Sequence, residues 1–127
     1  MERLFIKWRH LEINGETCLR CSETGKELNK AINLLKEVAK PLGVEVSLEE
    51  EIIGPEDFKL NPLKSNEIWI NGRLLEEWLG LKNTSTKCCD VCGDFYCRAI
   101  EVEGEVQEII PYELIVRAGL KALWESF

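Results

Sequence analysis

The spacing of hydrophobic positions changes along the chain and predicts strands and helices in turn. Residues 4–13 alternate loosely between apolar and polar side chains, which predicts a first β-strand. Strict alternation over residues 44–48 predicts a second strand. Between them, seven apolar residues recur at spacings of three and four and predict an amphipathic helix ending at Gly43: Leu28, Ala31, Ile32, Leu35, Val38, Ala39 and Leu42. A strand, a helix and a strand in this order imply a parallel pair with a right-handed connection.

The second half of the chain predicts antiparallel strands. Residues 67–70 read as a short strand, and Asn71-Gly72 is typical of a tight hairpin, because a type I′ turn needs positive φ at both central residues. Residues 73–76 are therefore expected to return as an antiparallel strand. Another hairpin is predicted around Glu103-Gly104. The acidic residues 49–51 are interpreted as a solvated edge.

A final helix is predicted after Pro111, which suits the first turn of a helix. The following residues are apolar on most of the helix circumference. We therefore expect the helix to be well buried, and part of residues 114–127 to lie in a homodimer interface.

Length and composition predict one domain over residues 1–127, since 45% of the residues are hydrophobic and can form a core. We expect no membrane span, because no run of 18 apolar residues occurs. The N-terminus lacks the features of a signal peptide, which predicts a cytoplasmic protein. The net charge is −7 and the cations are dispersed, so nucleic acid is excluded as a partner.

The six cysteines form two tight groups, and this placement predicts thiol chemistry. The first is a CxxC pair between the first strand and the long helix, and the second lies some seventy residues later. Cysteines two residues apart can form a disulfide or bind one metal ion. The groups are Cys18 and Cys21, then Cys88, Cys89, Cys92 and Cys97.

The first pair predicts a thiol–disulfide oxidoreductase that needs no cofactor and acts on a protein or small-molecule disulfide. Cys18 would attack as a thiolate and Cys21 would resolve the mixed disulfide. A helix N-terminus lowers a thiol pKa, and Arg20 adds a positive charge that modulates the pair. Thr24-x-x-Glu27 also fits a capping box, which would start the helix at Thr24 and weaken this effect.

The second group predicts either a metal site or a disulfide in a loop over about residues 83–98. Zinc and other thiophilic metals or metalloids favour clustered thiolates, with Cys89, Cys92 and Cys97 as the favoured ligands. A disulfide such as Cys92–Cys97 and free thiols remain alternatives. The single histidine, His10, is interpreted as a core or edge residue rather than a ligand. The alternative function is thus metal or metalloid binding without catalysis, through one or both cysteine groups.

Four segments resemble a family of small prokaryotic proteins of unknown function within the thioredoxin-like superfamily. They are residues 17–25 around the CxxC, residues 65–72, the cysteine loop ending Cys97-Arg98, and residues 110–115. The resemblance implies an α/β fold, a thioredoxin-like mixed sheet flanked by helices, with a cysteine-rich insertion after the central hairpin. Thioredoxin-like redox enzymes carry a cis-proline before the third strand, where this chain has Ser65-Asn66.

Overall fold

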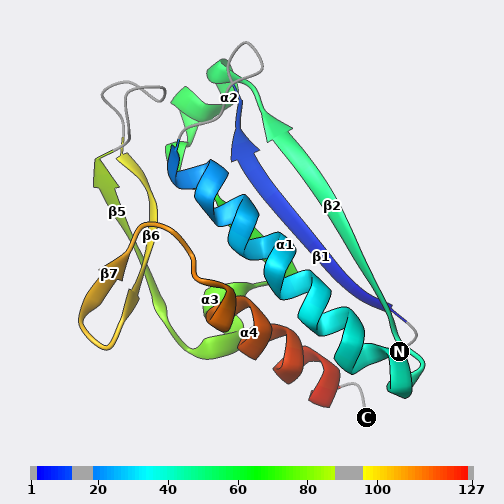
Figure 1. The fold of residues 1–127 in the computed structure, drawn as a ribbon. Helices are drawn as coiled ribbons and strands as arrows, with labels where there is room; N and C mark the ends of the chain where they lie inside the picture. Colours follow the sequence, from blue (N-terminus) through cyan, green and yellow to red (C-terminus); the bar gives the residue numbers. More distant parts are fainter. Residues whose placement is uncertain (1–2, 13–18, 88–95, 126–127) are drawn as a thin grey trace.

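The structure, a computed structural model, describes residues 3–12, 19–87 and 96–125 and is of the mixed α/β class (Figure 1). In this part of the chain four α-helices occur: α1 (Leu19–Ala39), α2 (Pro55–Leu60), α3 (Leu75–Leu79) and α4 (Tyr112–Glu125). The strands are β1 (Arg3–Leu11), β2 (Glu45–Ile53), β3 (Glu67–Ile70), β4 (Arg73–Leu74), β5 (Lys82–Lys87), β6 (Tyr96–Val102) and β7 (Glu105–Gln107).

The first sheet has four strands in the order β2-β1-β3-β4. β1 and β2 are parallel, as predicted, and β3 runs antiparallel to both β1 and β4. The predicted hairpin turn is confirmed, with φ values of 47° at Asn71 and 82° at Gly72. The returning strand is shorter than expected. β4 ends at Leu74, and α3 begins at Leu75, whose side chain is fully buried in the core.

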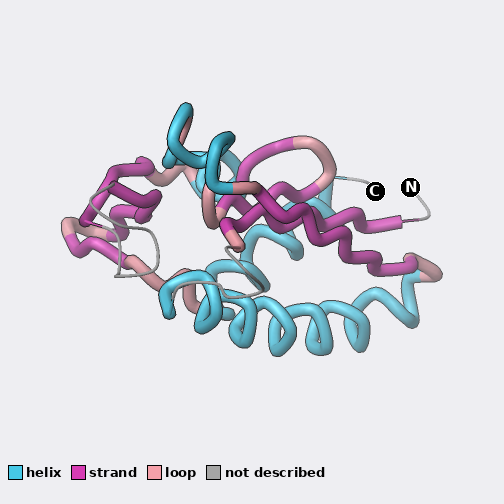
Figure 2. Tube along the Cα trace, turned by 90° about the horizontal axis from the view of Figure 1, so that it is seen from above, coloured by secondary structure: helices cyan, strands magenta, loops and turns pink. Residues whose placement is uncertain are grey.

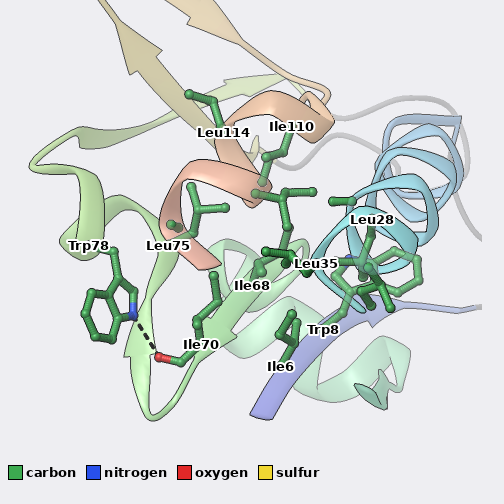
Figure 3. Close-up of a cluster of buried hydrophobic side chains, with 14 of the residues drawn as sticks. Ile6, Trp8, Leu28, Leu35, Ile68, Ile70, Leu75, Trp78, Ile110 and Leu114 are labelled. Atoms are coloured by element: carbon green, nitrogen blue, oxygen red, sulfur yellow. Dashed lines mark hydrogen bonds between the residues drawn. The ribbon is translucent and has the colours of Figure 1, made fainter. Parts of the chain in front are cut away.

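Helices α1 and α4 lie side by side on one face of this sheet (Figures 1 and 2). Their contact is close, because a Cβ added at Gly119 of α4 would lie 2.7 Å from a methyl group of Leu35 in α1. Gly25 of α1 leaves similar room for the ring of Trp8. Side chains from both helices and the sheet form the core shown in Figure 3, where Trp78 Nε1 donates a hydrogen bond to the Ile70 carbonyl.

The other face of β1 is more polar and is bound to β2 by ion pairs. Lys7 Nζ lies 2.7 Å from Glu51 Oε2, and Arg9 Nε lies 3.2 Å from the same oxygen. The hydrogen bond from Lys7 lowers the pKa of Glu51. The second strand is longer than predicted, because β2 extends to Ile53 and includes residues 49–51. These residues agree with the expected solvated edge, since β2 is an edge strand and Glu49 and Glu50 are exposed. Alternation alone could not predict the longer strand, because glutamates replace the apolar residues there.

The second sheet has three strands in the order β5-β6-β7. It replaces much of the predicted cysteine loop, because Lys82–Lys87 pairs with β6 in antiparallel register. Within the predicted loop over about residues 83–98, residues 83–87 and 96–98 belong to strands, and residues 88–95 lie outside the described residues. The turn predicted at Glu103-Gly104 is confirmed, with φ values of 50° and 84°.

One exposed apolar surface lies where α1 and α4 end. Val38 of α1, Leu42 of the short 3₁₀ helix η1 (Lys40–Leu42), and Leu120 and Trp124 of α4 are all exposed, Trp124 by 83%. They line an apolar groove of about 430 Å³. Its α4 side, formed by Leu120, Leu123 and Trp124, belongs to residues 114–127, where the sequence predicts a homodimer interface. The homodimer stays a prediction. None of the described helices has the length and apolar character needed to cross a membrane.

Candidate functional site

Cys21 lies in the first turn of α1, because the helix begins at Leu19. Its side chain is 1% exposed and is present as a thiol. The sulfur lies 3.5 Å from the hydroxyl oxygen of Ser65. Cys18 and the side chain of Arg20 lie outside the described residues. Of the three residues predicted for the redox site, Cys21 is therefore the one whose surroundings are defined.

The predicted capping box is wrong, because Thr24 lies inside α1 and is fully buried. Its Oγ1 accepts hydrogen bonds from the Ile110 amide and from Asn66 Nδ2, both at 3.2 Å. Glu27 Oε1 accepts from the amide of Tyr112, the first residue of α4, at 3.2 Å. The two residues that resemble a cap for their own helix thus bind backbone amides at the start of another helix. α1 begins before Thr24, at Leu19 within the CxxC.

Segment 62–67 faces Cys21 and is fixed to β1. It contains the short 3₁₀ helix η2 (Pro62–Lys64) followed by Ser65 and Asn66. The Leu11 amide donates to Ser65 Oγ at 3.2 Å, and the Asn66 amide donates to the Arg9 carbonyl at 2.7 Å. Trp8 Nε1 donates to Asn66 Oδ1 at 3.2 Å. Segment 62–67 is therefore held opposite Cys21 by a buried polar network.

Asn66 has a φ of 68°, in the left-handed region. Asparagine is among the side chains that adopt this conformation most readily. Its side chain contacts both Trp8 on β1 and Thr24 on α1. A single residue thus joins the sheet, helix α1, and the segment that faces Cys21.

We expect Thr24→Val to lower the free energy of unfolding by about 2–4 kcal/mol. The substitution keeps the shape of the side chain but leaves the Ile110 amide and Asn66 Nδ2 without their buried acceptor, and each orphaned donor costs about 1–3 kcal/mol. Urea unfolding measures the change, and Thr24→Ser, which keeps the hydroxyl, is the matched control. Equal stability of Thr24→Val and Thr24→Ser would contradict this role for the hydroxyl.

Cys97, the described member of the second cysteine group, is 1% exposed and disulfide-bonded. Cys88, Cys89 and Cys92 lie outside the described residues. Cys97 is on β6 and belongs to the same buried cluster as Cys21. In the state that the structure describes, the Cys97 sulfur is held in a disulfide rather than available as a metal-binding thiolate.

The residue after Cys97 anchors β6 to segment 62–67. Arg98 is 7% exposed, and its Nε donates to the Leu63 carbonyl at 2.8 Å. Its terminal nitrogens bind two buried carboxylates, Glu67 Oε2 at 3.0 Å and Glu76 Oε2. Arg9 and Trp69 also donate to the Glu67 carboxylate, at 2.9 and 3.3 Å. Segment 62–67 therefore contacts Cys21 through Ser65 and β6 through Leu63 and Glu67.

The sequence pattern did not predict this network, because its members are far apart along the chain. The partner of Glu76 is Arg98, 22 residues away. The available signal was a charged residue within an otherwise apolar strand, Cys97-Arg98-Ala99-Ile100. A charged side chain in such a strand is buried only when it is paired.

His10 is buried, at 3% exposure, and stacks on Trp8 with ring centroids 4.0 Å apart. Its Nε2 lies 2.6 Å from Glu50 Oε1 on the neighbouring strand. This agrees with its interpretation as a core residue. Across residues 3–12, 19–87 and 96–125, no group of three or more histidine, cysteine or acidic side chains is arranged to hold a metal ion.

Comparison with known proteins assigns the chain to a family. Residues 4–119 match the model of the family described as Domain of unknown function (DUF2703), a range that includes all six cysteines. The chain belongs to this family. A relative in Archaeoglobus fulgidus, described as an uncharacterized protein, is 61% identical over 113 residues, covering 89% of this chain and 82% of the relative. No solved structure matches the chain. The sequence-based assignment to a family of unknown function is thus confirmed.

Proposed function

We propose that this member of the DUF2703 family is a thiol–disulfide oxidoreductase with a thioredoxin-like fold, and that Cys18 and Cys21 are its reactive pair. The strand order β2-β1-β3-β4, with β1 and β2 parallel and β3 antiparallel, supports the fold assignment. The CxxC follows β1 in the sequence and ends at Cys21 in the first turn of α1, the place that the resemblance implies. A protein or small-molecule disulfide is the proposed substrate.

The observation that carries the proposal is the position of Cys21 in the first turn of a 21-residue helix. Backbone amides at a helix N-terminus have no acceptor within the helix and favour negative charge on a nearby sulfur. Thiols in such positions have pKa values lowered to roughly 3.5–7.5. A helix that began at Thr24 would leave Cys21 outside its first turn. Because α1 begins at Leu19, this argument against a lowered thiol pKa does not apply.

The proposed roles follow from burial and sequence order. Cys21 is buried and would resolve, while Cys18, which precedes the first helical residue, would attack the substrate. Arg20, between the two cysteines, would favour the Cys18 thiolate by its charge. No cofactor is required for this exchange.

The alternative is binding of zinc or another thiophilic metal or metalloid by the cysteine groups. Cys88, Cys89, Cys92 and Cys97 would supply the thiolates, and the disulfide at Cys97 would first have to be reduced. Metal content and thiol count of the purified protein separate the two functions. Metal-free protein that cycles two thiols supports the oxidoreductase, whereas stoichiometric metal that is lost when the cysteines are replaced supports metal binding.

We expect the pKa of Cys18 to lie at least about one unit below the 8.5 of an ordinary cysteine. Alkylation of the reduced protein at pH 6–7, followed by peptide mass spectrometry, should therefore modify Cys18 before Cys21 and before the other cysteines. Arg20→Glu should slow this alkylation by raising the pKa, and Arg20→Lys, which keeps the charge, is its control. Ordinary titration of Cys18 would count against the oxidoreductase.

A further inference from the structure

Ser65 is fully buried and lies between the end of β1 and the first turn of α1. Its Oγ accepts a hydrogen bond from the Leu11 amide at 3.2 Å and lies 3.5 Å from Cys21 Sγ. A hydroxyl has one proton to donate, and the Leu11 amide occupies one of its lone pairs. When Cys21 is a thiolate, its sulfur can only accept. In that state the order of donation is fixed: from the Leu11 amide to Ser65, and from Ser65 to Cys21.

We propose that Ser65 is a positioning residue that stabilises the Cys21 thiolate in the resolving step. The proposal rests on the function proposed above. In that step the Cys21 thiolate attacks the Cys18 sulfur of the mixed disulfide. The Cys18–Cys21 bond forms, the bond between Cys18 and the substrate sulfur breaks, and the substrate leaves as a thiolate with the bonding pair. The proton that Cys21 lost on ionising passes to water.

Burial makes such a donor necessary. A thiol in apolar surroundings has a raised pKa, because the thiolate loses its hydration. A hydrogen bond to the charged form opposes this effect. Cys21 is 1% exposed and belongs to the hydrophobic core cluster, so its thiolate depends on donors supplied by the protein.

Charged or titratable side chains on three elements around Cys21 are paired with other residues. On α1, Glu23 lies 3.1 Å from Lys26. On β1, His10 binds Glu50 on β2. On β3, Glu67 binds Arg98. The side chain of Arg20, in the same turn as Cys21, lies outside the described residues. The neutral hydroxyl of Ser65 lies 3.5 Å from the sulfur, within reach of a hydrogen bond.

The direct test titrates Cys21 in a Cys18→Ser background, with and without Ser65→Ala. Thiolate absorbance in the ultraviolet is followed against pH, and the Cys18→Ser/Cys21→Ser protein provides the blank for the other cysteines. Loss of one hydrogen bond to a charged group should raise the pKa of Cys21 by about one to two units. An unchanged pKa of Cys21 would overturn the proposal.

The matching kinetic effect is confined to the second step. Near neutral pH a rise of one pKa unit lowers the thiolate fraction about tenfold, while the more basic thiolate is about threefold more nucleophilic, so resolution should slow about threefold. The first attack by Cys18, measured separately, should keep its rate. A loss of both rates in equal proportion would overturn the proposal in favour of a purely structural role.

Two further variants separate this effect from loss of stability. Ser65→Thr keeps the hydroxyl and should restore the parent pKa. Leu35→Ala removes a fully buried side chain that packs against Gly119 of α4, far along α1 from Cys21, so it should destabilise the fold without moving the Cys21 pKa. Because the titration needs no turnover, a Ser65-dependent pKa without disulfide exchange would refute the proposed function alone. Exchange with a Ser65-independent pKa would refute only the role of Ser65.

Discussion

Arg98→Met should lower the free energy of unfolding by about 3–5 kcal/mol, because removing one partner of a buried ion pair leaves uncompensated charge behind. Arg98 binds both Glu67 and Glu76, and all three side chains are less than 10% exposed. Methionine fills similar space but leaves the Glu76 carboxylate without its guanidinium. Urea unfolding at neutral pH measures the difference.

The control for this effect is an exposed pair. Arg3 lies 3.8 Å from Glu45 with both side chains largely exposed, so Arg3→Met should cost less than about 1 kcal/mol. In Arg98→Met the buried Glu76 carboxylate has lost its guanidinium, so the deficit should shrink when acidification neutralises that carboxylate. If Arg98→Met does not fold at neutral pH, the double variant Arg98→Met/Glu76→Met, which removes both charges, should recover folding. Equal costs for Arg98→Met and Arg3→Met would contradict the network.

Cys18→Ser should reduce the rate of disulfide reduction to the rate measured without protein. A serine hydroxyl is not ionised near neutral pH and cannot form a mixed disulfide, so the first covalent step is lost. The assay follows reduction of glutathione disulfide under a regenerating thiol. Ser22→Ala, a change next to the pair, is the matched control and should keep the parent rate. Activity retained in Cys18→Ser would show that the reactive sulfur belongs to another cysteine.

Local patterns predicted the elements that depend on local rules. Alternation located β1, the three-and-four spacing located the body of α1, and Asn71-Gly72 located the turn from β3 to β4, because each reflects neighbouring residues in the sequence. The predicted start of α1 was wrong, because it depends on residues that are distant in the sequence. Thr24-x-x-Glu27 has the residues of a capping box, but its partners are Ile110 and Tyr112, more than eighty residues away.

The surroundings of the candidate site were likewise predicted only where they depend on local sequence. Sequence spacing identified the two cysteine groups, and the resemblance indicated that Ser65-Asn66 would lie opposite the CxxC. It could not give the contact between Ser65 Oγ and Cys21 Sγ, which depends on the Leu11 amide at the end of β1. Nor could it give Arg98, whose partners come from β3, α3 and the carbonyl of Leu63. Both features require knowing which strands meet.

The central claim, exchange through Cys18 and Cys21, is tested most directly by trapping its intermediate. The reduced Cys21→Ser variant is mixed with glutathione disulfide at neutral pH, quenched with acid, and mapped by peptide mass spectrometry beside the parent protein. The account predicts one glutathione adduct per chain on Cys18 in the variant. The parent should instead lose two hydrogen atoms in mass and carry a Cys18–Cys21 disulfide. Absence of an adduct at Cys18, or an equal adduct in the parent protein, would contradict the account.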